Sequence, residues 1–168
     1  MSATQDLSSA DAVKKLRELV KAGPTCMFAS ELTSIPFHVC PMETQQVDDQ
    51  GNLWFFSGAD SDHNAQIAID PRVQLIFSNP GSYEYLTVFG EAEISRDAAK
   101  IDELWSKMVE AWFPSGKDDP NLRLVRVRPG IAHYWATKNG KAISLVTMLV
   151  AGMTGKVPDI GVTGDLKV

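Results

Sequence analysis

The 168-residue sequence has only two cysteines, Cys26 and Cys40, and they do not form a CxxC pair. A zinc site built on paired cysteines is therefore not predicted. Both cysteines lie in apolar, strand-like segments, where we expect reduced and buried side chains. His38 and His133 also lie in strand-like segments, without a carboxylate at ligand spacing. We read both histidines as structural and predict no metal site.

Long hydrophobic runs are also missing. The longest apolar run, residues 142–153, is too short to span a bilayer and is interrupted by Ser144, Thr147 and Gly152. The first eleven residues are polar and lack the apolar core of a signal peptide. These features predict a soluble, cytoplasmic protein that does not act in a membrane.

Positive charge is scarce: 16 Lys and Arg face 21 Asp and Glu, which gives a net charge of −5. Nucleic-acid binding draws on clustered Lys and Arg, and no basic stripe is visible, so we expect no nucleic-acid partner. The chain is 44% hydrophobic, and its length suits one domain, residues 1–168, with one core.

The apolar pattern predicts many short strands joined by tight turns, which favours a mainly β (α+β) protein with a closed antiparallel barrel, since closure removes exposed sheet edges. The six or seven expected strands are residues 25–32, 37–47, 53–56, 72–78, 83–94, 122–128 and 131–137. The expected helices are one that Ser8 and Asp11 cap and Gly23 ends, one over residues 63–70, one from Asp97 through Trp112, and one over residues 142–153 before a loose tail.

Two residues inside predicted strands constrain the sheet. Pro41 cannot donate a ladder hydrogen bond, so its strand lies at an edge or is bulged there. Gly90 marks a bend or a close approach of two backbones.

The most informative stretch runs from Leu53 to Ser78: a strand, a polar loop with Ser57 and Ser61, a short helix stopped by Pro71, and a second strand. Backbone N–H groups at a helix start, together with the two hydroxyls, suit a bound anion. The alternative is an ordinary connection capped by Ser61. The neighbouring aspartates oppose the anion interpretation because carboxylates repel phosphate.

The order of four stretches resembles the FMN-binding split β-barrels related to pyridoxamine 5′-phosphate oxidase, and within them the general stress protein branch. The stretches are residues 40–42, 53–61, 70–73 and 111–120, with Tyr134 and Trp135 downstream, and the likeness covers about residues 7–156. The resemblance implies a split barrel that forms a homodimer and holds FMN, or alternatively FAD, at the two-fold interface.

Carried over residue by residue, the resemblance implies a set of cofactor-binding positions. Pro41 and Met42 would lie beside the isoalloxazine ring, Phe56 and Ser57 would flank the cofactor, and Ser61, His63 and Asn64 would surround the phosphate. Tyr85 and Trp135 would approach the ring, and Trp112 would belong to a cap over the pocket.

Two positions depart from the family pattern. Cys40 stands where an arginine is usual, and His63 stands where a lysine is usual. Both basic residues would pair with the phosphate, so their loss predicts FMN binding that is weak or that strengthens at acid pH. Asp62 is expected to compensate in part by raising the charge on His63.

Three functions remain open from the sequence. The first is a flavin-dependent oxidoreductase, in which the cofactor supplies the chemistry and no catalytic side chain is assigned. The second is a non-catalytic flavin-binding or buffering protein in a stress response. The third is a barrel that has lost FMN or holds haem or a deazaflavin instead. Pyridoxamine phosphate oxidation itself is not expected, because no arginine follows Arg128.

Overall fold

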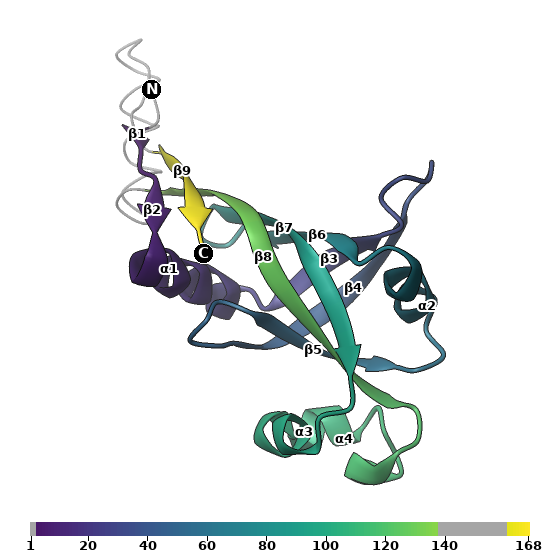
Figure 1. Cartoon of the computed structure of the whole chain (residues 1–168). Coiled ribbons are helices and arrows are strands. Elements are labelled where there is room, and N and C mark those ends of the chain that lie inside the picture. Colours follow the sequence, from purple (N-terminus) through teal and green to yellow (C-terminus); the bar gives the residue numbers. More distant parts are fainter. Residues whose placement is uncertain (1–2, 138–160) are drawn as a thin grey trace.

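Figure 1 shows a computed structural model of the chain, which describes residues 3–137 and 161–168. The helix predicted over residues 142–153 lies outside the described residues. None of the helices within the described part is long and apolar enough to cross a membrane.

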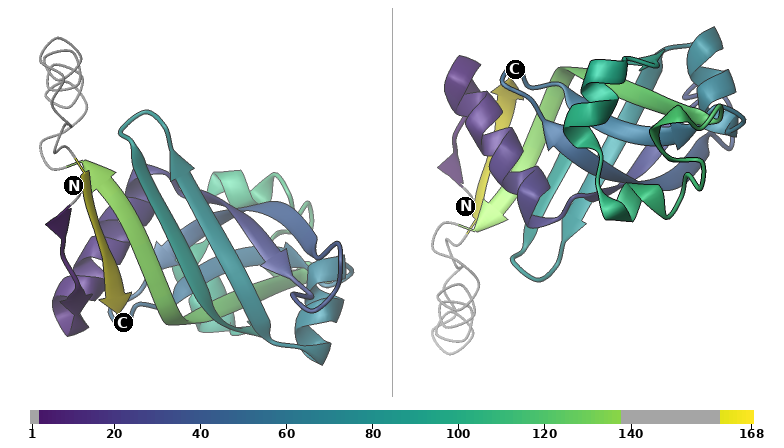
Figure 2. Two further views of the ribbon diagram at one scale, coloured as in Figure 1. Left: turned by 90° about the horizontal axis from the view of Figure 1, so that it is seen from above. Right: turned by 90° about the horizontal axis from the view of Figure 1, so that it is seen from below.

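Six antiparallel strands close into a barrel, which confirms the predicted fold class (Figures 1 and 2). They are β3 (Thr25–Ser30), β4 (His38–Val47), β5 (Leu53–Gly58), β6 (Arg72–Asn79), β7 (Glu84–Ser95) and β8 (Leu122–Thr137). The order around the barrel is β8-β5-β4-β3-β6-β7, and pairing of β7 with β8 closes the ring. Strands β3, β4 and β5, consecutive along the chain, are antiparallel neighbours and form a meander.

The edge interpretation of Pro41 is confirmed. Pro41 pairs with Met27 of β3 on one side, while β5 joins β4 only from Thr44 onward. The bulge in β4 lies between Thr44 and Gln46 and not at the proline. The strands β4 and β5 thus separate at this end, and the side chains of residues 38–42 lie at the split.

The barrel departs from the prediction at β8, which is one continuous strand instead of two. Pro129 and Gly130 look like a turn in the sequence, but the ladder absorbs them through a register shift opposite Phe89 and Gly90. A Cβ atom on Gly90 would lie 2.3 Å from the carbonyl oxygen of Arg128. Gly90 therefore marks a close backbone approach, one of its two predicted roles.

The expectation of a loose tail is wrong. Residues Gly161–Lys167 form β9, which pairs with the projecting end of β8 from Ala132 to Thr137. Two short strands, β1 (Ala3–Thr4) and β2 (Leu7–Ser8), then run parallel to β9. The partners of β9 are strands that lie far from it in the sequence. The weak polarity pattern of residues 161–167 therefore does not predict a strand by itself.

Four helices flank the barrel in the described residues, and two details of them differ from the prediction. They are α1 (Ser9–Ala22), α2 (Asp62–Ile69), α3 (Ala98–Leu104) and α4 (Lys107–Glu110), followed by a 3-10 turn, η1 (Gly116–Asp118). Ser8 precedes α1 but makes no side-chain cap hydrogen bond, so the expected capping box does not form.

The helix predicted from Asp97 through Trp112 breaks into α3 and α4. Asp97 caps α3 as expected, by accepting a hydrogen bond from the Lys100 amide. At Trp105 the backbone is extended, and the Trp105 ring packs edge-on against Phe56 with centroids 6.1 Å apart. Ser106 then caps α4 through the Val109 amide. Packing of the partly buried Trp105 against Phe56 and the new cap at Ser106 outweigh continuation of the helix.

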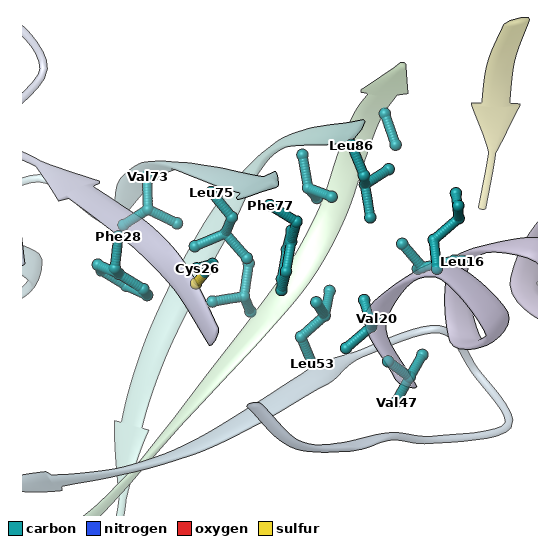
Figure 3. Packing of buried hydrophobic residues seen from close by; sticks show 14 of the residues in the cluster. Leu16, Val20, Cys26, Phe28, Val47, Leu53, Val73, Leu75, Phe77 and Leu86 are labelled. Atoms are coloured by element: carbon teal, nitrogen blue, oxygen red, sulfur yellow. The ribbon is translucent and has the colours of Figure 1, made fainter. Parts of the chain in front are cut away.

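The main core fills the barrel and extends under α1 (Figure 3). Inward-facing side chains from the strands meet one face of α1, and Figure 3 shows Leu16 and Val20 of α1 against Val47 and Leu53. A second cluster lies between α3, α4 and the first residues of β8. Cys26 is buried in the main core, and burial raises the pKa of its thiol to about 12.

The turn between β4 and β5 is organised by Asp48. Its carboxylate accepts hydrogen bonds from the Gln50 and Asn52 amides, both at 2.9 Å, from the Asn52 side chain at 3.0 Å, and from the Trp54 indole at 2.9 Å. Partial burial would raise the pKa of Asp48, but these hydrogen bonds outweigh it and lower the pKa. Asp48 thus stabilises the turn in its ionised form.

Candidate functional site

Three potential ligand side chains meet at the split end of the barrel. His38 and Cys40 are two residues apart on β4, so their side chains share one face of the strand. His63 lies in the first turn of α2 and packs beside Phe28, with ring centroids 6.0 Å apart. One ligand atom from each of the three lies within 4.8 Å of the others, and Cys40 Sγ is 3.8 Å from His63 Nδ1. All three side chains are half-buried.

Ser61 holds the His63 ring in place. Its hydroxyl donates to the carbonyl oxygen of Gly58 at 2.7 Å, and the same oxygen lies 3.1 Å from His63 Nε2. A hydroxyl has one proton to donate, so Ser61 Oγ accepts from His63 Nε2–H. This assigns the proton to Nε2 and leaves the lone pair of Nδ1 facing the sulfur of Cys40.

Ser57 and Asn64 form a second polar pair under the same loop. Ser57 is buried, and its hydroxyl donates to Asn64 Oδ1 at 3.1 Å. The Asn64 amide donates in turn to the Gly58 carbonyl oxygen at 2.8 Å. The residues predicted to surround a phosphate, together with Ser57, are thus brought together, and their side-chain hydrogen bonds tie the loop to the start of α2.

The electrostatics of this cluster differ from the expectation. Burial lowers the pKa of His63, the nearby His38 lowers it further, and Asp62 raises it by less. Asp62 therefore raises the pKa of His63 as expected, but by less than burial and His38 lower it. His63 is accordingly neutral at pH 7. Burial also raises the pKa of the Cys40 thiol. The cluster holds a thiol and a neutral imidazole where the family pattern has two cations.

A second feature is an apolar surface on the outside of the barrel, which we call the outer apolar face. It consists of exposed side chains from neighbouring strands: Met27, Val39, Pro41, Ile76, Tyr85, Ile131 and Trp135. The register makes it continuous, since Met27 lies opposite both Pro41 and Ile76, and Tyr85 lies opposite Trp135. In the left panel of Figure 2, β6, β7 and β8 lie in front, α1 and α3 lie behind them and α2 lies at the end of the barrel, so no helix of the described residues covers this side. Contiguous exposed apolar surface of this kind marks interaction sites.

The predicted site residues fall into separate groups. Pro41, Tyr85 and Trp135 lie on the outer apolar face, whereas Met42 points the other way and is buried opposite Cys26. Phe56 packs against Trp105 and Phe113, next to α3 and α4. Trp112 follows α4 and is 80% exposed. Within one chain, Met42, Phe56 and Trp112 do not join the outer apolar face.

The histidines also separate. His133 Nδ1 is 2.6 Å from Asp165 Oδ1, and its Nε2 is 2.8 Å from Thr163 Oγ1, so these bonds link β8 to β9 and fit the predicted structural role. His38, read in the same way from the sequence, instead joins the cluster with Cys40 and His63. The alternation of His38 and Cys40 along one strand was a signal for this, but the approach of α2 is visible only in the fold.

A separate hollow of about 630 Å³ lies between α1, the β4–β5 turn and α3, and is lined by polar residues that include Arg17, Asp48, Lys100 and Glu103. None of the predicted cofactor-binding residues lines it.

Residues 11–159 match the family model described as pyridoxamine 5′-phosphate oxidase like. The chain belongs to this family. The match covers most of the chain and confirms the resemblance inferred from the sequence, including its general stress protein branch.

Among curated relatives of this pyridoxamine 5′-phosphate oxidase-like chain, general stress protein 26 of Bacillus subtilis (strain 168) is 44% identical over 45 residues, which are 27% of this chain and 31% of the relative. Protein bli-3 of Neurospora crassa is 25% identical over 117 residues, which are 63% of this chain and 56% of the relative. The matches therefore span about a third to just over half the length of these two relatives.

Solved structures agree with the fold. A proposed general stress protein 26 from Jannaschia sp. CCS1 superposes with a TM-score of 0.79 at 26% identity, covering 95% of this chain and 99% of that one. The general stress FMN/FAD binding protein from Xanthomonas citri superposes with a TM-score of 0.65 at 31% identity, covering 74% of this chain and 87% of that one.

Proposed function

We propose that two copies of this chain associate through their outer apolar faces and bind a flavin there, FMN in the first place and FAD as the alternative. The outer apolar face carries this proposal. It places Tyr85 and Trp135 side by side, at 38% and 45% exposure, with Pro41 on the same side of the barrel. Aromatic and apolar side chains that are this exposed suit both a flat ring system and a second protein surface.

The similarity to known proteins supports the same ligand class. The Xanthomonas citri protein, 31% identical over 74% of this chain, is named as an FMN/FAD binding protein. The family name itself refers to an oxidase of a phosphorylated pyridine compound. A flavin is therefore the ligand that we propose for this chain.

The residues fit the ring of a flavin more fully than its phosphate. The phosphate would rest on backbone amides in the first turn of α2 and on Ser61, next to the neutral His63. Neutral donors hold a phosphate less strongly than charge-assisted pairs do. We therefore expect FMN to bind this chain only slightly better than riboflavin, which has the same ring and no phosphate.

When bound, a flavin accepts and passes on hydride equivalents, and we propose an oxidoreductase role on that basis. The chain's own part would be to hold the ring between apolar surfaces and to exclude water from it. Hydride transfer by the flavin requires no acid or base side chain from the cluster of His38, Cys40 and His63.

The test is a titration of the purified chain with riboflavin, FMN and FAD, followed by flavin fluorescence and by the visible spectrum. Trp135→Ala should weaken binding of all three ligands, because all three share the ring. Ile69→Ala is the matched control, since Ile69 is 88% exposed on α2, away from the outer apolar face. A wild-type chain that binds none of the three would refute the proposal.

Turnover separates an oxidoreductase from a binding protein. The assay is oxidation of NADH or NADPH by the flavin-loaded chain, with a quinone or dye as acceptor. Turnover that Trp135→Ala reduces supports the oxidoreductase role. Stoichiometric flavin without turnover would support a flavin-binding or buffering role instead.

A further inference from the structure

We propose that His38, Cys40 and His63 form a binding site for Zn²⁺, with two imidazole nitrogens and one thiolate sulfur as ligands. This site shares His63 with the region proposed for the flavin phosphate, but it uses the inward face of β4 and the start of α2, and needs neither a cofactor nor a second copy of the chain.

The geometry is close to that of a bound site. With Zn–S near 2.3 Å and Zn–N near 2.0–2.1 Å, the ligand atoms of a tetrahedral site lie roughly 3.3–3.6 Å apart. Cys40 Sγ and His63 Nδ1 are 3.8 Å apart, and all three ligand atoms lie within 4.8 Å of one another. Side-chain rotations that shorten these distances by up to about 1.5 Å would complete the set.

The backbone already fixes two of the ligands. His38 and Cys40 share one face of β4, and β3 holds that strand through the pairs Ser30–His38 and Phe28–Cys40. The third ligand comes from α2, a rigid element, instead of a free loop. Ligands on paired strands and helices keep their positions better than ligands on loops.

Ser61 supplies the outer contact that metal-binding histidines use. A ligating histidine usually donates its second ring N–H to an oxygen, which fixes the tautomer and the ring plane. Here the Gly58 carbonyl accepts from Ser61, and Ser61 accepts from His63 Nε2–H, so that Nδ1 is the free ligand atom. Nδ1 is also the atom that faces Cys40. The ring is therefore oriented for metal binding before any metal arrives.

The ligand types select a borderline-soft divalent ion. Imidazole and thiolate together suit Zn²⁺, and hard ions such as Mg²⁺ and Ca²⁺ prefer oxygen ligands. Three protein ligands leave a fourth position, and the half-buried cluster gives water access to it. On binding, the S–H bond of Cys40 breaks, the Zn–S bond forms, and the proton passes to solvent. The ion would also bring positive charge to a cluster in which Cys40 and His63 stand at positions where the family resemblance implies basic residues.

The experiment uses the full chain, stripped of metal by a chelator and kept free of flavin. Co²⁺ is the probe, because a cobalt–thiolate bond gives a charge-transfer absorption band in the near ultraviolet. We expect one equivalent of Co²⁺ per chain with this band, release of about one proton, and displacement of Co²⁺ by Zn²⁺. Each of His38→Ala, Cys40→Ser and His63→Ala should weaken binding by more than about 100-fold, beyond the range seen for outer-contact residues.

Two controls carry the same residue types elsewhere in the fold. His133→Ala and Cys26→Ala should both keep one equivalent of Co²⁺ and the thiolate band. Ser61→Ala should also keep the stoichiometry and the band but bind roughly 10- to 100-fold more weakly. Thermal melts of every variant establish that it is folded before it is titrated.

The proposal is overturned if the folded wild-type chain takes up no Co²⁺ or Zn²⁺ at micromolar concentration. It is equally overturned if Cys40→Ser binds as tightly as the wild type, or if the bound Co²⁺ shows no thiolate band. In each of those cases the three side chains simply pack together. Flavin plays no part in any arm, so the outcome is independent of the flavin titrations.

Discussion

Replacing His63 by lysine tests the charge deficit at the polar loop. In the wild-type chain this position is a neutral imidazole, because burial and His38 lower the pKa of His63. A lysine there would place an ammonium group in the first turn of α2, beside Ser61. A hydrogen bond to a charged group contributes about 1.5–3 kcal/mol, and each 1.4 kcal/mol is a tenfold change in affinity. We therefore expect His63→Lys to bind FMN about 10- to 100-fold more tightly than the wild type.

The assay compares FMN with riboflavin, which carries the same ring without the phosphate. Riboflavin affinity should stay the same in His63→Lys, so the ratio of the two dissociation constants reports the phosphate contact alone. The gain should also shrink as salt is raised, since the position is half-exposed and salt screens charges there. His63→Gln is the neutral control and should leave the FMN-to-riboflavin ratio unchanged.

One result would refute the reasoning about the phosphate. If His63→Lys leaves FMN affinity unchanged, or tightens FMN and riboflavin equally, His63 does not contact the phosphate. The same variant must lose Co²⁺ binding, because lysine replaces an imidazole ligand. The two readouts therefore separate the flavin proposal from the zinc proposal within one protein.

Three further predictions concern assembly and stability. Ile76→Asp should convert a dimer to monomers in sedimentation experiments, because a charge would enter the outer apolar face, whereas Ile69→Asp on α2 should not. Asp48→Asn should lower the free energy of unfolding by about 1.5–3 kcal/mol at pH 7, measured by urea denaturation, because the carboxylate that accepts four hydrogen bonds is lost. Because the folded-state pKa of Asp48 is lowered, its contribution is present above the usual value of 3.8, and the difference between the two proteins should shrink as pH falls below that value. Gly90→Ala should cost about 1–3 kcal/mol and lower the melting temperature, because its Cβ would meet a backbone oxygen at 2.3 Å, and an unchanged melting temperature would contradict the close approach.

The barrel could be predicted largely from local patterns, because its strands are short, alternate in polarity and are joined by tight turns. The unit from Leu53 to Ser78 is confirmed as β5, α2 and β6. Errors arose where distant contacts decide the structure. Pro129 and Gly130 resemble a turn, but pairing with β7 carries β8 through them. The weakly patterned residues 161–167 form a strand only because β8 offers an edge.

In the candidate site, too, local sequence features were predictable and contacts between distant segments were not. The resemblance singled out Cys40 and His63 as positions where basic residues were expected, and the structure places these two side chains in contact. It did not show that His38 completes a triad, because the distance from β4 to α2 depends on how the barrel closes. Nor could it separate Tyr85 and Trp135, which share the outer face, from Phe56 and Trp112, which lie near α4.

Pro41 has a consequence for how copies of the chain meet. Among the described residues, the segment of β4 that contains it has a partner strand on one side only, so another chain could extend the sheet there. The missing proline N–H interrupts any such added ladder. Growth of an open-ended fibre by strand addition is thereby discouraged at this edge, so that the contact between copies proposed above would depend on side chains of the outer apolar face.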